Sequence, residues 1–384
     1  MSVVAVACDD DGGQNEDTPV TKPPPATGVP GGPSFVALGD SIAAGEGTYY
    51  GFEYQDRSIL PTWSPPSDAD PRWEGRYQEC HISRFAYNQD VARRVGARLH
   101  PLVCTGAAYD NGISVPEVQD GETWRPAEFG NWSAQTDLNP VYDQAAPDVV
   151  TITFGADDVH FVGILQYCLL AAYGISNRLD AHIAASSNPD AVIDRRLGSV
   201  LDDLGRAVED EVDPSARPSD PFCTADKPGR YIEQNFLDQE ADLAANHRAL
   251  ALDIQARGEQ DGKVPAVIVT TYHDPLPTAD ADISFLACPD ALTLDRSQID
   301  YLHELLATMD QIITESLAGL DGVTVADIDD VMDGHEFCTS DPWAYGPSIL
   351  FQNAESQAPF HPTPEGQRAI ADVVYEALPA EYRR

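Results

Sequence analysis

The sequence predicts a three-layer α/β domain in which a parallel, doubly wound sheet is covered by helices on both faces. Short apolar runs typical of buried strands alternate along the chain with segments in which apolar residues recur at helical spacing. The chain has 384 residues, of which 42% are hydrophobic, so it is long enough for one large domain with a sizeable core. We expect this domain to cover residues 34–384, with long loop insertions, and residues 1–33 to lie outside it.

The first half of the chain carries two clear strand signals. Phe35–Leu38 predicts a buried strand that ends at Gly39, and Val149–Phe154 is a continuous apolar run of the kind found in strands covered on both faces. A weaker run at residues 102–103 predicts a short strand. The helix expected before this short strand is predicted by apolar residues at every fourth position: Tyr87, Val91, Val95 and Leu99.

The second half continues the alternation. Val267–Val269 and Val323–Val325 predict strands. The long helix between them is predicted by apolar residues at helical spacing: Ile299, Leu302, Leu305, Leu306, Met309, Ile312 and Ile313. The last helix is expected to begin with Thr363 as its N-cap and Pro364 at its first position. The apolar face predicted for this helix comprises Ile370, Val373, Val374, Ala377 and Leu378.

Three stretches lack a clear pattern, namely residues 45–80, 107–146 and 172–228. Irregular stretches of this length in a compact domain are usually functional lids or rims, so we expect them to surround a ligand site. A separate lid subdomain within residues 172–258 is the alternative.

The formal net charge of the chain is -40. Such a charge repels phosphates, so we do not expect nucleic acid as a partner. An acidic surface suited to salty surroundings and the codon bias of a GC-rich genome both explain this composition. The chain has no apolar run of the length, about 18 residues, that a membrane-spanning helix requires.

The seven cysteines fall into two groups. Cys8 stands alone near the N-terminus, whereas the others are widely spaced, with no CxxC pair typical of a zinc site. An even number of cysteines within a folded region indicates three disulfides and an oxidising compartment, with buried free thiols as the alternative. The sequence does not fix which of these cysteines pair: Cys80, Cys104, Cys168, Cys223, Cys288 and Cys338.

The N-terminus carries a second indication of export. Ala5-Val6-Ala7-Cys8 has the small-residue pattern of a bacterial lipobox, in which Cys8 would be lipidated, although only seven residues precede it. Residues 9–33 are polar and rich in Pro and Gly, as is typical of a disordered tether. We therefore expect an exported protein, either extracellular or a lipoprotein tethered to the cell envelope through Cys8.

The strongest chemical signal is the segment Leu38-Gly39-Asp40-Ser41-Ile42. It lies where a strand ends and a helix is expected to begin, so the Ser41 hydroxyl would project beyond the carboxyl edge of the sheet, where open α/β sheets bind ligands. The helix N-terminus would also supply N–H groups able to stabilise an oxyanion. An ordinary turn with an N-cap is the alternative explanation of these residues.

The chain resembles the SGNH (GDSL-like) hydrolases, in particular their secreted, disulfide-containing esterases and lipases. Ser41 falls in the GDS block of that family, and Gly106 falls where the second block places a glycine. Further matches follow in family order from about residue 34 to residue 378: Cys80-His81-Ile82-Ser83, Gly155-Ala156-Asp157-Asp158, Gly334–Cys338 with Pro342-Trp343, and Phe360-His361-Pro362 leading into Gly366.

This resemblance implies a metal-independent and cofactor-independent ester hydrolase with Ser41 as nucleophile and His361 as base. The oxyanion hole would comprise the N–H groups of Ser41 and Gly106, with Asp157 at the third position. The acyl ester substrate would belong to a small molecule, a lipid or a glycan, and the enzyme would act as a monomer. The resemblance also implies sequential disulfides: Cys80–Cys104, Cys168–Cys223 and Cys288–Cys338.

Asp157 departs from the family pattern, which has asparagine at this position. An amide donates a hydrogen bond to the developing oxyanion, whereas a carboxylate repels it. Asp157 could stay protonated by sharing a proton with Asp158. Alternatively, the Ser41 and Gly106 N–H groups suffice, or the protein is a slow or inactive relative that binds ligands at the cell surface.

A second departure concerns the residue that orients His361. Many family members have Asp three residues before the histidine, where this chain has Ala358. We expect a main-chain carbonyl to orient His361 in a Ser–His dyad, with Glu355 as the alternative. His335, Glu336 and His160 are weaker site candidates: the first two could belong to a structural loop, and the third to a helix surface.

Overall fold

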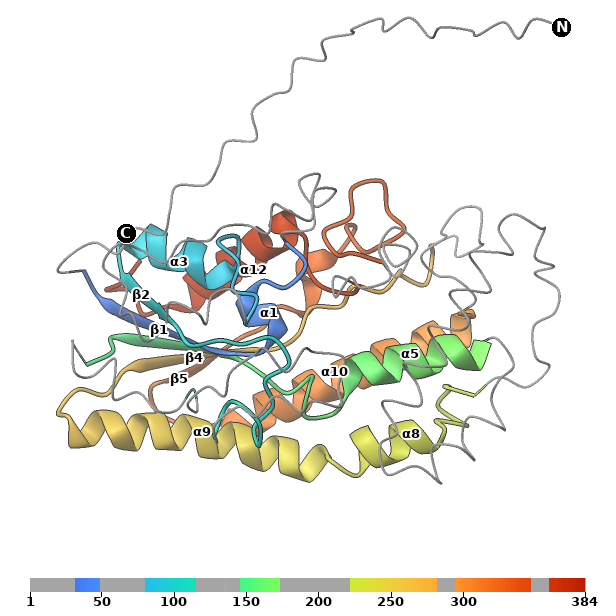
Figure 1. Cartoon of the computed structure of the whole chain (residues 1–384), viewed down its shortest axis with the longest axis horizontal. Helices are drawn as coiled ribbons and strands as arrows, with labels where there is room; N and C mark the ends of the chain where they lie inside the picture. The colour runs from blue at the N-terminus through green and yellow to red at the C-terminus, as the bar shows by residue number, and fades with distance from the viewer. Residues whose placement is uncertain are drawn as a thin grey trace, which may run out of the picture.

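The computed structural model describes residues 32–48, 80–114, 135, 146–172, 222–281, 294–346 and 359–383. Its centre is a five-stranded sheet in which every neighbouring pair of strands is parallel (Figure 1). The strands are β1 (Ser34–Gly39), β2 (Arg98–Pro101), β3 (Val149–Thr153), β4 (Ala266–Thr270) and β5 (Val323–Ala326). Their order, β2-β1-β3-β4-β5, is that of doubly wound, flavodoxin-like sheets, so the predicted fold class is confirmed.

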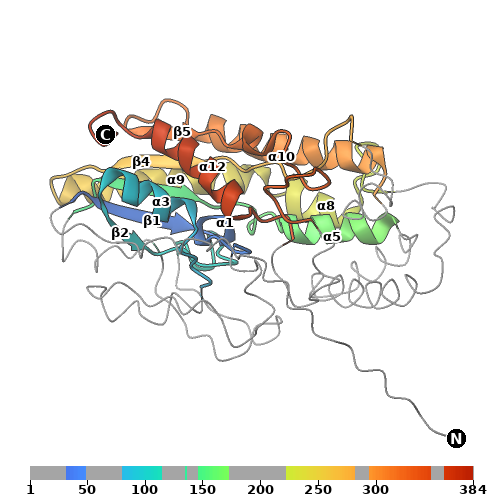
Figure 2. The same cartoon turned by 90° about the horizontal axis from the view of Figure 1, so that it is seen from above.

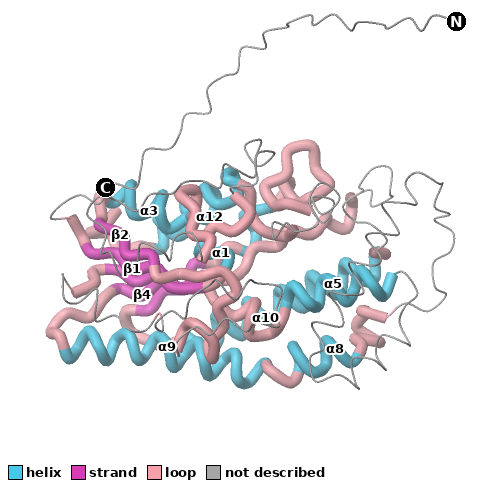
Figure 3. The backbone as a smooth tube through the Cα atoms, in the orientation of Figure 1, coloured by secondary structure: helices cyan, strands magenta, loops and turns pink. Residues whose placement is uncertain are grey.

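Helices cover both faces of the sheet. The helical segments are α1 (Ser41–Ala44), α3 (Tyr87–Val95), α5 (Phe161–Ala172), α8 (Arg230–Ile232), the π-helix η3 (Glu233–Leu237), α9 (Glu240–Gln260), α10 (Arg296–Leu317), the 3₁₀ helix η5 (Asp329–Met332) and α12 (Pro364–Ala377). One layer contains α3 and α12, and the opposite layer contains α9 and α10 (Figures 1 and 2). In Figure 3 the magenta strands lie between these cyan layers. Every residue of β1 and β3 is buried, as their apolar runs predict.

Polar N-cap residues set where α12 and α10 begin. Thr363 is the N-cap of α12, because its side chain accepts a hydrogen bond from the Gly366 N–H at 3.3 Å, and Pro364 follows it as predicted. Helix α10 begins with a capping box in which the Asp295 side chain and the Gln298 side chain each accept from the other residue's N–H. Both caps satisfy backbone donors that the helix itself leaves free.

Two boundaries predicted near residue 99 are wrong. Helix α3 ends at Val95, because Gly96 adopts a left-handed conformation (φ 65°) that closes the helix. Leu99 lies in β2, and the strand expected at residues 102–103 instead occupies Arg98–Pro101. Leu99 therefore lies four residues after Val95 by coincidence and belongs to the strand, not to the helix.

Most of the three unpatterned stretches lies outside the described residues. Of residues 172–258, for which a lid subdomain was the alternative, the described part includes α9, which packs along α10 in one layer of the main domain. At one end of the molecule α5 lies beside α8 (Figures 1 and 2). In the described ranges, the structure has no helix long and apolar enough to cross a membrane.

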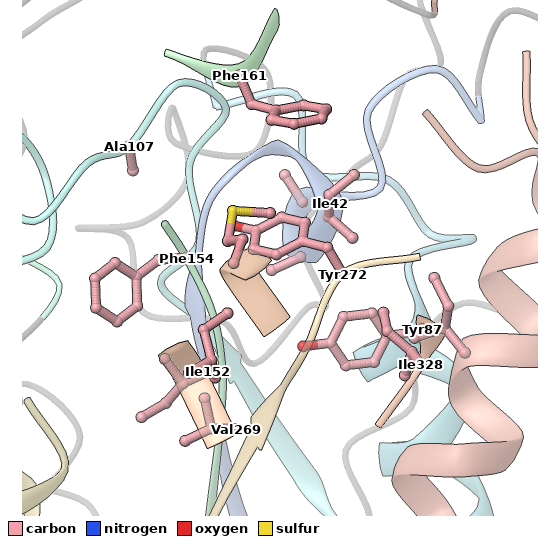
Figure 4. Packing of buried hydrophobic residues seen from close by; sticks show 14 of the residues in the cluster. Ile42, Tyr87, Ala107, Ile152, Phe154, Phe161, Val269, Tyr272 and Ile328 are labelled. Atoms are coloured by element: carbon pink, nitrogen blue, oxygen red, sulfur yellow. The ribbon is translucent and has the colours of Figure 1, made fainter. Parts of the chain in front are cut away.

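The core lies on both faces of the sheet and continues to its carboxyl edge, where Ile42 lies near Tyr272 and the Phe154 ring points to the other side (Figure 4). A line of buried hydroxyls crosses this core. The Tyr87 hydroxyl lies 2.8 Å from Thr153 Oγ1, which lies 2.7 Å from Thr270 Oγ1. These bonds satisfy polar groups that would otherwise be costly to bury.

Asp310 on α10 introduces a pH-sensitive group into this core. Its Oδ1 accepts from the Tyr272 N–H at 2.8 Å, and its Oδ2 has no partner among the described residues. Burial raises the pKa of Asp310 to about 8, and the charges of Asp329, Asp327 and Asp274 add to the shift. Since the folded state holds this proton and the unfolded state releases it near pH 4, stability falls as pH rises from about 4 to about 8.

At pH 8 we expect Asp310→Asn to have a higher free energy of unfolding than the wild type, by up to about 5 kcal/mol, because each pKa unit is worth about 1.4 kcal/mol and the pKa of Asp310 rises from 3.8 to about 8. The amide oxygen still accepts from Tyr272 but carries no charge. Urea unfolding of both proteins at pH 5 and pH 8 measures this difference. A wild type and variant that lose equal stability between the two pH values would contradict the assignment.

Candidate active site

Ser41 lies in a tight turn at the carboxyl end of β1. Gly39 ends the strand with φ 139°, and a Cβ atom there would lie 2.1 Å from the Thr153 carbonyl oxygen, so the position requires glycine. The Asp40 N–H donates to the same carbonyl at 2.9 Å, and α1 begins at Ser41. The turn therefore directs the start of α1 toward the gap between β1 and β3, where the strand order reverses and doubly wound folds bind ligands.

Asp40, the N-cap of α1, links three loops at this edge of the sheet. It is fully buried, and its carboxyl accepts from the Ile42 N–H at 2.9 Å and from the Tyr272 hydroxyl. The Tyr272 oxygen in turn accepts from the Ala156 N–H at 2.9 Å. Burial raises the pKa of Asp40 well above its ordinary value, and the charge of Asp157 raises it further. Tyr272 thus connects the turn after β1 with the loop after β3.

His361 lies against Ser41, although 320 residues separate them. The His361 Nε2 is 2.8 Å from Ser41 Oγ, and the Nδ1 is 3.1 Å from the Pro359 carbonyl oxygen. A carbonyl can only accept, so Nδ1 carries the proton and Nε2 is free to accept from the serine hydroxyl. A main-chain carbonyl, that of Pro359, thus contacts the ring. Glu355, the alternative, lies outside the described residues.

Neighbouring backbone bonds hold the His361 segment. The Phe360 N–H donates to the Tyr345 carbonyl at 2.6 Å, the Tyr345 N–H donates to the His361 carbonyl at 3.0 Å, and the Thr363 N–H donates to the Trp343 carbonyl at 2.7 Å. These bonds form a short antiparallel pairing directly before α12. Backbone hydrogen bonds therefore lie on both sides of His361, which is 7% exposed.

His335 and Glu336 belong to the loop that supports this pairing. The His335 ring stacks on Trp343 at 3.6 Å between ring centroids, and its Nδ1 lies 2.8 Å from the Asp341 carbonyl oxygen. Glu336 is buried, and its carbonyl accepts from the Thr339 hydroxyl. Both residues thus make structural contacts within the loop. His160 is exposed, with φ 51°.

The segment that contains Gly106 is fastened beside the end of β1. The Cys104 N–H donates to the Gly39 carbonyl at 3.0 Å, and the Thr105 N–H donates to the Cys80 carbonyl at 3.2 Å. Gly106 follows with φ 73°. Within the described ranges, neither the Gly106 N–H nor the Ser41 N–H donates a hydrogen bond. Both groups are available to an oxygen atom of a ligand.

Asp157 lies in the loop after β3, between two other acidic groups. The Asp158 Oδ1 accepts from the Tyr109 N–H at 3.0 Å, and its Oδ2 has no partner among the described residues. Burial raises the pKa of Asp158 to about 6, and the charges of Asp157 and Asp110 contribute. Asp157 also raises the pKa of Asp40, so its carboxyl is close enough to interact with both neighbours. A proton shared in this group is held at higher pH than on an isolated aspartate.

Disulfides join Cys80 to Cys104 and Cys168 to Cys223, the pairs that the resemblance implies. Cys338 is disulfide-bonded as well. Cys288 and Cys8 lie outside the described residues. The first bridge ties the Gly106 segment to the chain before α3, so it supports the site directly.

Tyr272 and His273 were not predicted from the sequence as site residues. Both follow the strand expected at residues 267–269 and so come directly after the carboxyl end of a buried strand, where site residues gather in parallel sheets. Their position directly after a buried strand was the signal in the sequence that could have identified them. Their contacts, to Asp40 and to the Phe360 carbonyl, join segments far apart in the chain.

No protein-family model and no curated protein matches the sequence. Among solved structures, the chain is similar to an extracellular lipase from Streptomyces rimosus, with 16% identity over 90% of this chain and 100% of that chain and a TM-score of 0.46. It is also similar to an aryl esterase of M. smegmatis in an inhibitor-bound form (10% identity, 90% of this chain and 97% of that chain, TM-score 0.37). A carbohydrate acetylesterase from Sinorhizobium meliloti is similar to a comparable degree (10%, 90% and 97%, TM-score 0.35). Because these TM-scores lie below 0.5, the fold assignment rests on the sheet topology, and any activity must be argued from the geometry of the site.

Proposed function

We propose that this protein is a carboxylic-ester hydrolase that works through an acyl-enzyme on Ser41. The observation that carries the proposal is the 2.8 Å contact between Ser41 Oγ and His361 Nε2, with the opposite ring nitrogen on a main-chain carbonyl. A serine hydroxyl within hydrogen-bond reach of a base that a third group orients is the arrangement needed for nucleophilic catalysis.

In the proposed reaction, Ser41 Oγ attacks the ester carbonyl while His361 Nε2 takes its proton. The negative charge that develops on the carbonyl oxygen is stabilised by the Ser41 and Gly106 N–H groups. His361 then donates its proton to the leaving alcohol, which departs as the acyl-enzyme forms. Water, which gives a proton to His361, then attacks the acyl carbonyl. The bond to Ser41 Oγ breaks, the carboxylic acid is released, and His361 returns the proton to Ser41. Apart from the ester and water, these steps use only groups of this chain.

The second candidate is a surface binding protein on the same scaffold that has lost most of its activity. Asp157 favours it, because a carboxylate at that position opposes an oxyanion. A serine-reactive phosphonate separates the two: the ester hydrolase is expected to become covalently modified at Ser41, as mapped by peptide mass spectrometry. A protein that stays unmodified with its fold intact would support the binding protein instead.

The disulfides indicate the compartment in which the protein works. Disulfides are typical of oxidising compartments, so Cys80–Cys104 and Cys168–Cys223 support export. We propose a monomer that is extracellular or anchored to the cell envelope by lipidation of Cys8. Its substrates would be acyl esters of small molecules, lipids or glycans.

A further inference from the structure

We propose that His273 is a positioning residue that aligns His361 by holding the Phe360 carbonyl. The His273 Nε2 lies 3.0 Å from the Phe360 carbonyl oxygen, and the side chain is 4% exposed. That carbonyl belongs to the same peptide group as the His361 N–H. This inference rests on the proposed function, since it concerns how the base of that reaction is oriented.

His273 is a fixed hydrogen-bond donor. Burial and, to a smaller extent, the neighbouring His361 lower the pKa of His273 to about 4, so the ring stays neutral at neutral pH. A neutral imidazole carries one N–H, and a carbonyl can only accept, so that hydrogen is on Nε2. The Nδ1 has no partner among the described residues. Among the described residues, the His273 ring therefore makes a single hydrogen bond, to the Phe360 carbonyl directly before His361.

The backbone around His273 is anchored on both sides. Before it, the Tyr272 N–H donates to Asp310 Oδ1 at 2.8 Å. After it, the Asp274 N–H donates to the Asp329 carbonyl at 3.3 Å. Since this segment continues directly from β4, His273 extends from the rigid part of the fold.

The segment that receives the bond needs such support. Phe360 has φ 66°, a left-handed conformation that bulky residues rarely adopt. Its N–H donates to the Tyr345 carbonyl at 2.6 Å, and His273 holds its carbonyl. Together the two bonds fix both peptide groups of Phe360. Without the His273 bond, the peptide between Phe360 and His361 can rotate and carry the imidazole away from Ser41.

The test compares His273→Leu, which removes the donor, with His273→Gln, whose terminal N–H takes the place of Nε2–H. We expect the leucine variant to lower kcat for p-nitrophenyl acetate by about 10- to 100-fold, because small misplacements of a catalytic group have effects of this size. KM should change by less than about twofold, and the glutamine variant should keep at least about a third of the wild-type kcat. His100→Leu, a buried histidine on β2 paired with Val36, is the matched control and should leave kcat unchanged.

Full kcat in His273→Leu would overturn the proposal, and so would an equal loss of kcat in the glutamine and leucine variants. If the leucine variant does not fold, His273→Asn, whose side chain is too short to reach the carbonyl, replaces it with the same expectation. If the wild type shows no hydrolysis that depends on Ser41, the proposed function is refuted but the proposed role of His273 is not. The role of His273 is then judged by the ¹⁵N shifts of the His361 ring, which should move in the leucine variant and not in the glutamine variant; unchanged shifts in both would refute it.

Discussion

Replacement of His361 by alanine is expected to lower kcat for ester hydrolysis by at least about 10³-fold. The 2.8 Å contact to Ser41 Oγ makes His361 the only described side chain placed to take the serine proton. Without it, Ser41 remains a neutral hydroxyl of low nucleophilicity. The N–H groups near Ser41 would still stabilise the oxyanion, so a residual rate above the uncatalysed reaction is expected.

The measurement is steady-state hydrolysis of p-nitrophenyl acetate by the wild type and His361→Ala. Added imidazole should restore part of the lost rate if the space left by the side chain admits it as an external base. The thermal unfolding temperature of the variant shows whether the short pairing before α12 is intact. A folded variant with more than about a tenth of the wild-type kcat would show that His361 is not the base.

Substitution of Asp157 by asparagine is expected to raise kcat by about 10-fold or more. An asparagine amide can donate to the developing oxyanion, whereas the carboxylate repels it. Removal of the charge also lowers the pKa of Asp158 and Asp40, both of which the Asp157 charge raises. We expect wild-type activity to fall above pH 6, because Asp158, with a pKa of about 6, is ionised there and adds a second negative charge beside Asp157. The gain in kcat from Asp157→Asn should therefore be larger at high pH.

Rates between pH 5 and pH 9 measure this effect, with Asp158→Asn as the matched control. That variant keeps an oxygen to accept from the Tyr109 N–H but cannot become charged, so it should lessen the fall of wild-type activity above pH 6 without raising the rate at pH 5. Complete loss of turnover in Asp157→Asn would mean that the Asp157 carboxyl takes part in the reaction, and that the proposed oxyanion hole is wrong.

Much of the sheet could be predicted from the sequence because its strands are buried on both faces. Phe35–Leu38 and Val149–Phe154 read as continuous apolar runs, and both proved to be central strands. The edge strand β2 was misplaced, since Arg98-Leu99-His100-Pro101 has no such run. Burial on both faces therefore made β1 and β3 visible, whereas β5 lies at the other edge, is only partly buried, and was predicted from its two valines.

Helix α9 was missed for a different reason. Its buried side includes His247 between the apolar residues Leu243 and Leu250, so the stripe reads as interrupted. The structure shows why a histidine is tolerated there: its ring lies 4.0 Å from that of Phe154, and its Nε2 is 2.9 Å from the Phe154 carbonyl oxygen. These contacts come from a loop about 90 residues earlier, which no local pattern reports.

In the candidate site, too, some residues could be identified from the sequence and others could not. Ser41 could be proposed from its position after a strand, and its pairing with His361 from the motifs that resemble SGNH hydrolases. The roles of Asp40, Tyr272 and His273 could not be predicted in this way, because these roles come from contacts between loops that meet only in the folded protein. Residue type and position thus point to the reacting groups, whereas the groups that hold them become visible only in three dimensions.

The most direct test of the proposed function is the hydrolysis of p-nitrophenyl acetate by the wild type beside Ser41→Ala, followed by longer acyl esters. We expect the turnover seen in the wild type to disappear in Ser41→Ala, while the unfolding temperatures of the two proteins agree. The acyl length with the highest kcat/KM would then define the substrate class. Equal rates in the two proteins would contradict an acyl-enzyme on Ser41 and leave the surface binding protein as the better description.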